Sequence, residues 1–200
     1  RLFGRCFVRL DEKDGLILTL IDGKIGCYDP IVNKLIATEY ESRIEMINDY
    51  YLAKKDGKLG VIDVGKNEIL PFKYDEIFQW NDSSYLVSLE KEFQVINKSE
   101  EMIYKPFQTI TPILQNSDQT IYRFVRNGKY GLISSKYGEL LAPEFTDIIN
   151  ISSAEKPFFF ADQHLDKAGF HVVSYVNERG KLVFSKAYTK EEFEKILCDQ

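Results

Sequence analysis

The side chains best suited to acid–base, metal or nucleophilic chemistry are few in this sequence and lie far apart. It holds two histidines, His164 and His171, and three cysteines, Cys6, Cys27 and Cys198, which include no Cys-x-x-Cys pair. A zinc site needs several Cys, His or carboxylate ligands, and a reactive cysteine needs a neighbouring cation or base. We therefore predict no metal site, no cofactor and no catalytic residue. The odd number of widely spaced cysteines favours a reducing compartment over a disulfide scaffold.

Paired carboxylates can catalyse hydrolysis, and Asp75, Glu76 and Asp147 stand in turns that could bring such a pair together. However, these acids recur at equivalent points of a repeated pattern, as do Asp29 and Asp63. A catalytic pair is needed once, whereas a turn is needed in every repeat. We interpret these acids as turn residues whose oxygens accept backbone hydrogen bonds.

Three glycines, Gly26, Gly60 and Gly131, each follow a turn glycine by three positions and lie inside segments that read as strands. A glycine in a strand usually marks a bulge or a close approach of another part of the backbone. The spacing forms neither a Gly-x-Gly-x-x-Gly nor a Walker motif, and no helix follows it. The sequence therefore gives no support for phosphate binding.

The elements that carry these residues belong to a repeat. Asp-Gly or Asn-Gly between strand-like runs is a strong hairpin signal, because glycine readily adopts the positive φ that a tight hairpin turn needs. Such turns centre on Gly23, Gly57 and Gly128. The first interval is 34 residues (57 minus 23) and the second is 71 (128 minus 57), or two periods. A copy without the turn glycine falls at 90–92.

Each period holds about four short strands, so the sequence predicts an all-β fold of tandem antiparallel β-meander repeats of about 35 residues, propeller-like or stacked as a solenoid. We predict a single domain over residues 1–200. Its copies are placed at about 1–21 (partial), 22–55, 56–90, 91–126, 127–163 and 164–188 (partial).

A short capping helix is predicted at 189–198. Thr189 and Glu192 have the spacing of a capping box, and Phe193 and Leu197 fall on one apolar face. Its expected role is to cover the last open edge of the sheet array.

Composition limits the classes of partner. The 200 residues carry a net charge of −5, so their field repels phosphate backbones and attracts basic proteins. We predict no nucleic-acid binding. No segment approaches the roughly 18 apolar residues of a membrane helix, which predicts no membrane partner. The N-terminal residues are too short in apolar length for a signal peptide, so we expect a cytoplasmic location, with a removed leader left open.

The segment from Asp56 to Asp63, which reads Asp-Gly-Lys-Leu-Gly-Val-Ile-Asp and precedes a Pro-containing strand and Tyr74-Asp75, resembles the WG repeat family. The match is closest over 56–80, good over 127–150, fair over 22–47 and poor over 91–113. The family's typical tryptophan is replaced by the apolar residues Ile25, Leu59 and Tyr130. The resemblance implies a bacterial, all-β repeat protein without shared catalytic residues, of a kind found in surface proteins and among immunity proteins that neutralise secreted toxins.

Acidic and aromatic side chains gather in two segments one period apart, around 39–51 and 74–85. Tyr and Trp are favoured interface anchors, and carboxylates steer basic partners. The candidate partner-binding residues are Glu41, Glu45, Asp49, Tyr51, Asp75, Glu76, Trp80, Asp82 and Tyr85. The alternative is that the tyrosines belong to the core and the acids to a solvated rim.

We interpret the chain as a non-enzymatic protein-binding module, and more specifically as an immunity protein that covers the active site of a basic, nuclease-type toxin. The alternative is a repeat domain of a bacterial surface or scaffold protein that binds a peptide or a glycan. A third class is an enzyme that uses the segment from His164 to His171. Alanine at both histidines would leave every activity intact if this third class were wrong.

Overall fold

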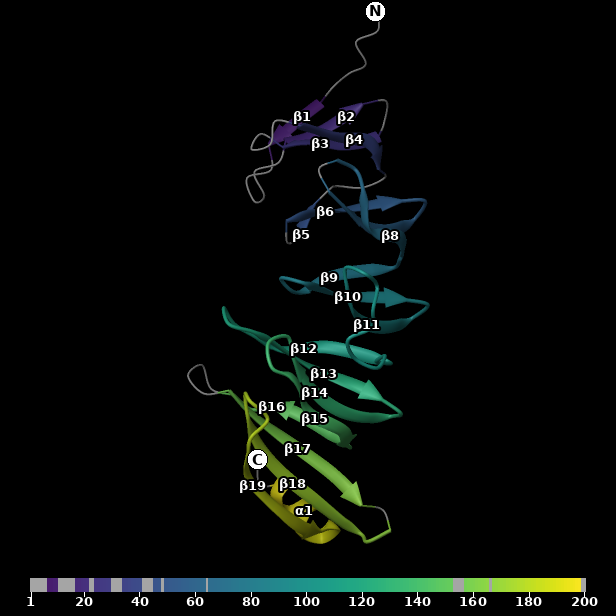
Figure 1. Ribbon diagram of the computed structural model, residues 1–200. Helices are drawn as coiled ribbons and strands as arrows, with labels where there is room; N and C mark the ends of the chain where they lie inside the picture. The colour runs from purple at the N-terminus through teal and green to yellow at the C-terminus, as the bar shows by residue number, and fades with distance from the viewer. Residues whose placement is uncertain are drawn as a thin grey trace, which may run out of the picture. The chain divides into compact units, whose positions relative to one another are not determined.

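The computed structural model describes the backbone of residues 7–10, 17–21, 24–29, 34–40, 45–47, 49–63, 65–152, 157–165 and 167–198. Within these ranges, side chains are described at residues 40 and 47 and from 49 to 195. The chain forms two compact units, Arg1–Lys105 and Pro106–Gln200, where we predicted a single domain. Each unit is built from antiparallel sheets whose consecutive strands are neighbours (Figure 1).

The first unit contains three sheets. The first comprises β1 (Phe7–Leu10), β2 (Ile17–Ile21), β3 (Lys24–Asp29) and β4 (Lys34–Tyr40). The second comprises β5 (Glu45–Ile47), β6 (Tyr50–Lys55), β7 (Lys58–Ile62) and β8 (Glu68–Tyr74). The third comprises β9 (Glu76–Asn81), β10 (Ser84–Leu89) and β11 (Glu92–Asn97). In this third sheet an isolated bridge between Ile96 and Met102 stands where the other sheets have a fourth strand.

The second unit contains two four-stranded sheets and a helix. One sheet comprises β12 (Thr109–Gln115), β13 (Thr120–Arg126), β14 (Lys129–Ser134) and β15 (Gly138–Phe145). The other comprises β16 (Asp147–Asn150), β17 (Phe158–Leu165), β18 (Phe170–Asn177) and β19 (Leu182–Thr189), and α1 (Lys190–Cys198) follows. Four-stranded antiparallel meanders of this kind resemble propeller blades. The prediction of an all-β fold built from repeated sheets with a short C-terminal helix is confirmed.

The sheets keep the predicted period but not the predicted phase. We began each copy at a glycine turn, whereas Gly57 lies between β6 and β7, and Gly128 lies between β13 and β14, the second and third strands of their sheets. The hairpin is therefore the middle of a meander. As a result, each sheet joins the second half of one predicted copy to the first half of the next.

The hairpin turns at Gly57 and Gly128 have the positive φ that we predicted, whereas the turn at Gly23 lies outside the described residues. Asp56 and Gly57 have φ of 51° and 76°, and Gly128 has 71°. In the third sheet Glu90 and Lys91 take the same two places with φ of 52° and 69°. The turn conformation therefore persists without glycine, even though a left-handed conformation costs other L-residues about 1 to 2 kcal/mol each.

Two of the three strand glycines, Gly60 and Gly131, mark close approaches of the chain, as predicted. A Cβ atom added at Gly60 would lie 2.9 Å from the ring of Phe72. At Gly131 it would lie 2.4 Å from Cζ of Phe124 and 2.7 Å from the carbonyl oxygen of Leu141. In both sheets the pairing register shifts at this point, as it does at a β-bulge.

A side-chain oxygen holds the turn between the third and fourth strands. Asp63 Oδ1 accepts the backbone N–H of Asn67 at 2.8 Å. Asn97 and Asn177 stand at the matching points of later sheets, and each accepts two backbone N–H groups of its own turn at 2.9 to 3.0 Å. The predicted role of Asp63 is thus confirmed. The side chain of Asp29 lies outside the described residues.

The core of each unit lies between sheets that pack face to face. In the first unit, buried residues of β5–β8 meet buried residues of β9–β11: Ile47, Val61, Leu70 and Tyr74 with Ile77, Tyr85, Val87 and Ile96. In the second unit, β12–β15 meets β16–β19 through Ile121 and Leu132 with Ile148, Phe159, Ala161 and Val176. Sheet-on-sheet burial is what a repeat with one apolar face per sheet requires.

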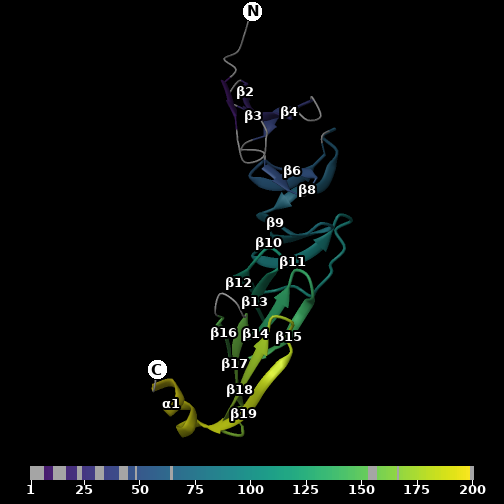
Figure 2. The same cartoon turned by 90° about the vertical axis from the view of Figure 1, so that its left-hand side faces the viewer.

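The C-terminal helix has the predicted capping box. The N–H of Thr189 donates to Glu192 Oε2 at 2.9 Å, and the N–H of Glu192 donates to Thr189 Oγ1 at 3.3 Å. However, the buried Phe193 stacks on His171 of β18, which is not the outermost strand. The expectation that the helix covers the sheet edge is therefore corrected, because α1 follows β19 without a linker and lies against a face of the sheet (Figure 2). Residues 182–184 of the edge strand are exposed.

Candidate functional site

The aromatic residues predicted to anchor a partner lie in the core. Tyr51, Trp80 and Tyr85 are exposed by only 4%, 5% and 0%. Tyr85 and Tyr74 belong to the apolar cluster between the second and third sheets, and Trp80 lies 6.3 Å from the ring of Tyr104. Their side chains are thus used for packing, and this part of the predicted site is wrong.

Asp75 has a structural role. Its carboxylate lies 2.5 Å from the ammonium group of Lys58, and this hydrogen bond lowers the pKa of Asp75. Its backbone N–H donates to the carbonyl oxygen of Ser88 at 2.9 Å. Asp75 therefore links the turn of one sheet to the strand of the next, which explains why an acid fits at this point of the repeat.

The remaining predicted acids do not form one surface. Asp49 and Asp82 are exposed in the turns that precede β6 and β10, whereas Glu76 is exposed at the start of β9. The six residues of β9 separate the two ends of the sheet by roughly 17 Å at about 3.3 Å per residue. Glu41 lies outside the described residues, and the side chain of Glu45 does as well.

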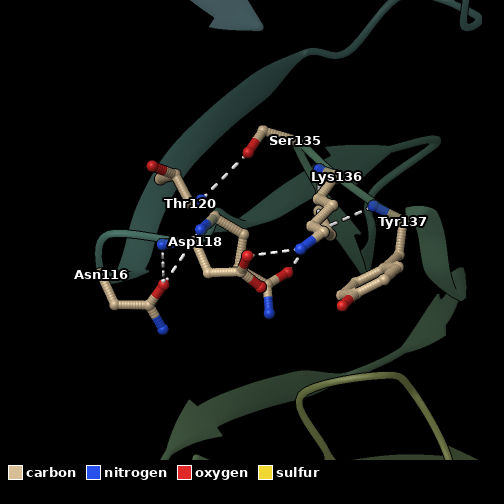
Figure 3. A network of polar contacts seen from close by, with 8 residues as sticks. Asn116, Asp118, Thr120, Ser135, Lys136 and Tyr137 are labelled. Atoms are coloured by element: carbon tan, nitrogen blue, oxygen red, sulfur yellow. Dashed lines mark hydrogen bonds and ion pairs between the residues drawn. The ribbon is translucent and has the colours of Figure 1, made fainter.

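A polar network joins two turns of the sheet β12–β15 (Figure 3). Asn116 Oδ1 accepts the backbone N–H of Asp118 at 2.9 Å, and Asp118 pairs with Lys136. The Asp118 carboxylate raises the pKa of Lys136. The ring of Tyr137 lies 5.4 Å from the Lys136 ammonium and 5.6 Å from the Arg179 guanidinium. Because these groups are engaged with one another across the turns, we interpret the network as structural.

The two histidines, which we expected in a loop and a strand, face each other on β17 and β18. The rings of His164 and His171 are parallel, with centroids 4.3 Å apart, and Phe193 covers the far side of His171 at 4.0 Å. His171 Nδ1 lies 3.1 and 3.2 Å from the two carboxylate oxygens of the buried Asp162. A carboxylate–histidine pair can serve acid–base chemistry, but both faces of this imidazole are covered by rings. The arrangement fixes α1 on the sheet.

The same face of this sheet continues into an aromatic patch in which Phe184 is exposed and the other rings are partly buried. Tyr175, four residues along β18 from His171, lies 5.8 Å from the rings of Phe160 and Phe184 and 6.2 Å from that of Phe158. We call Phe158, Phe160, Tyr175 and Phe184 the aromatic row. Phe160, Tyr175 and Phe184 are cross-strand partners on β17, β18 and β19, and Ile149 on β16 extends the line.

The aromatic row lies opposite the core of its unit. The alternate residues of β17, Phe159 and Ala161, are fully buried against the preceding sheet. By contrast, Ile149 is 47% exposed and Phe184 45% exposed. This face was not predicted from the sequence, although the run Phe158-Phe159-Phe160 carried a signal. Successive strand residues point to opposite faces, so three phenylalanines in line place rings on both sides of a strand.

Other kinds of site find no support in the part of the chain that the structure describes. Among these residues no group of three or more His, Cys, Asp or Glu side chains is placed to hold a metal ion. No helix among them has the length and apolar character needed to span a membrane.

Comparison with known proteins gives a fold likeness only. No protein-family model matches the chain, and no curated protein matches it. Similar solved structures include Hsv2 of Kluyveromyces lactis (11% identity, TM-score 0.38, covering 90% of this chain and 64% of that one). A eukaryotic initiation factor is similar at 8% identity with a TM-score of 0.40, covering 86% of this chain and 52% of that one. The N-terminal domain of Nup159 is similar at 10% identity with a TM-score of 0.35, covering 91% and 75%.

The chain therefore spans about half to just under two thirds of the length of the first two of these structures. At such identities and scores the likeness carries no argument about what the chain binds or does.

Proposed function

We propose that this chain is a non-enzymatic module that binds another protein, and that it does so through the outer face of the sheet β16–β19. The observation that carries the proposal is the aromatic row. Contiguous exposed apolar patches mark interaction sites in soluble proteins, and Tyr and Phe are enriched in the buried centre of interfaces. In the row, Tyr175 is surrounded by three phenylalanine rings within 6.2 Å, so the rings are already ordered before a partner arrives.

We further propose that the sheets are copies of one WG-type repeat, arranged like propeller blades or like the layers of a solenoid. Support comes from features that recur at matching positions. These are the positive-φ pair at the central hairpin, the close-approach glycine after it, and the side-chain oxygen that holds the next turn.

For the partner, we propose a basic protein, most specifically a nuclease-type toxin that the chain neutralises in the cytoplasm as an immunity protein. The net charge of −5 and the exposed Asp49, Glu76 and Asp82 support this choice, because surface carboxylates raise the association rate of a basic partner. An apolar contact at the aromatic row would then slow dissociation. The alternative is a surface or scaffold repeat domain that binds a peptide or glycan with the same rings.

The test is capture of a partner from the source cytosol by the tagged full chain, with two matched variants. Phe184→Ser removes an exposed ring of the row, whereas Phe78→Ser removes a ring of similar exposure (50%) on β9. We expect the wild type and Phe78→Ser to capture one basic protein in stoichiometric amount and to abolish its activity, and Phe184→Ser to capture at least tenfold less. Equal capture by all three proteins would refute the docking face. Capture of glycan in place of protein would favour the alternative.

A further inference from the structure

We infer that the partner covers the aromatic row with a single amphipathic helix, an inference that rests on the protein-binding function proposed above. Part of this sheet face is already covered by α1, and the aromatic row continues from that part. There the ring of Phe193 on α1 stacks on the imidazole of His171, with ring centroids 4.0 Å apart and an angle of 7° between the ring planes. The row begins two residues beyond Val173 on β18, and on the same face, because alternate residues of a strand point to one side. The covered part thus shows that this face can pack against a helix.

The size of the aromatic row also favours a single helix. The line from Ile149 to Phe184 crosses three strand spacings, about 14 Å at about 4.8 Å each. Along the strands the row extends over the two-residue step from Phe158 to Phe160, roughly 7 Å, plus the width of its side chains. A patch of a few hundred Å² is well below the roughly 800 Å² that each partner contributes to a standard interface between folded proteins. It matches one helix, which is about 10 Å wide and spans 14 Å in about ten residues.

The competing mode is addition of a strand to the edge of β19. The apolar part of that edge is irregular: Leu182 pairs with Val176 while Phe184 pairs with Tyr175, so Val183 is an extra residue in the ladder. A bulge of this kind interrupts the regular row of backbone donors and acceptors that an added strand needs. The open face, rather than the edge, is therefore the better docking surface.

The test uses two synthetic peptides of about 14 residues with the same composition. One places Leu and Phe at helical spacing (i, i+3, i+4, i+7) among Glu and Lys, and the other alternates apolar and polar residues as a strand does. Binding is followed by amide chemical shifts of the isotope-labelled full chain. We expect the helical peptide to shift Phe160, Tyr175 and Phe184, with affinity at least tenfold above that of the alternating peptide. Its binding should fall at least tenfold in Phe184→Ser and stay unchanged in Phe78→Ser.

Three outcomes would overturn the inference: equal binding of both peptides, shifts along β19 in place of the row, or no shift at about 1 mM peptide, the concentration at which even a weak contact is detected. Ile149→Ser serves as a second variant at the other end of the row. The proposed function is tested separately by the captured partner. If capture needs Phe184 but the helical peptide does not compete, the helix is wrong and the docking face stands. If capture does not need Phe184, the docking face itself is wrong.

Discussion

The close approach at Gly131 allows a stability prediction that can be worked from distances. An added Cβ would lie 2.4 Å from Cζ of Phe124 and 2.7 Å from the carbonyl oxygen of Leu141, both far inside van der Waals contact. Phe124 has little room to move, because it is fully buried and packs edge-on against Phe107 at 5.0 Å. Overpacking of a dense core costs about 1 to 3 kcal/mol. Replacing a strand glycine by alanine returns about 0.5 to 1 kcal/mol of backbone entropy. Because the added atom meets a ring that cannot move away, its cost lies in the upper half of that range, and we expect Gly131→Ala to destabilise by about 1 to 2.5 kcal/mol.

The matched control is Gly60→Ala at the same point of an earlier sheet. There the nearest atoms lie at 2.9 Å and belong to Phe72, which is only partly buried and is therefore freer to shift. The backbone oxygen of Leu70 lies at 3.0 Å, farther away than the oxygen of Leu141 at Gly131. Its expected loss is smaller, below about 1 kcal/mol.

Urea unfolding separates the two variants. The single tryptophan, Trp80, lies in the first unit, so its fluorescence reports that unit, whereas circular dichroism reports both. An unchanged midpoint for Gly131→Ala, or a larger loss for Gly60→Ala, would refute the reasoning. A Phe124→Leu background, which removes Cζ, should reduce the penalty of Gly131→Ala, and purely additive losses would count against the clash.

Three further predictions follow from local geometry. Lys91→Gly should stabilise the chain by about 0.5 to 1 kcal/mol in urea unfolding, because glycine adopts the φ of 69° without the left-handed penalty; a loss of stability would contradict the turn assignment. The hydrogen bonds from Thr189 lower the pKa of Glu192 from its ordinary value of 4.5. The ionised carboxylate therefore stabilises the start of α1 in full at a pH above 4.5. This stabilisation is lost as the pH falls through the lowered pKa of the folded state. The first turn of α1 should therefore fray on acidification of the wild type, which NMR detects as the loss of its helical chemical shifts. No such step should occur in Glu192→Gln. His171→Leu leaves the buried Asp162 without its partner and should cost about 1 to 3 kcal/mol; Asp162→Asn keeps an acceptor for the imidazole and should cost less, and equal losses would argue against the pair.

The fold was largely predictable because its turns have chemical requirements that short segments reveal. Asp56-Gly57 and Asn127-Gly128 predict their hairpins because glycine and asparagine tolerate positive φ, and both hairpins are present with that conformation. The hairpin at Glu90-Lys91 keeps the conformation without the signal. It was found from the period of the neighbouring turns, which shows that repetition can locate an element whose own residues do not predict it.

The candidate site was less predictable, because the same residue types serve the core and an interface. Tyr51, Trp80 and Tyr85 have the chemistry of interface anchors, but the packing of sheet on sheet decides whether they are accessible, and all three are buried. In β10, which carries Tyr85, residues on both faces of the strand are buried. The grouping of the predicted acids was wrong for a different reason. Nearness in sequence placed Glu76 with Asp82, although a strand runs between them and carries them to opposite ends of the sheet.

The aromatic row illustrates where a repeat protein can acquire a binding surface. In the interior of each unit the apolar face of one sheet is covered by the next sheet, so conspicuous aromatic residues there are explained by packing alone. In β16–β19 one face packs on β12–β15, whereas among the residues that the structure describes the opposite face is covered only in part, by α1. The rings at Phe160, Tyr175 and Phe184 stand on the remaining part, and their partial exposure is therefore not explained by packing within the unit. An ordered apolar surface that the fold itself does not need is the feature that a partner can use without disturbing the repeats that support it.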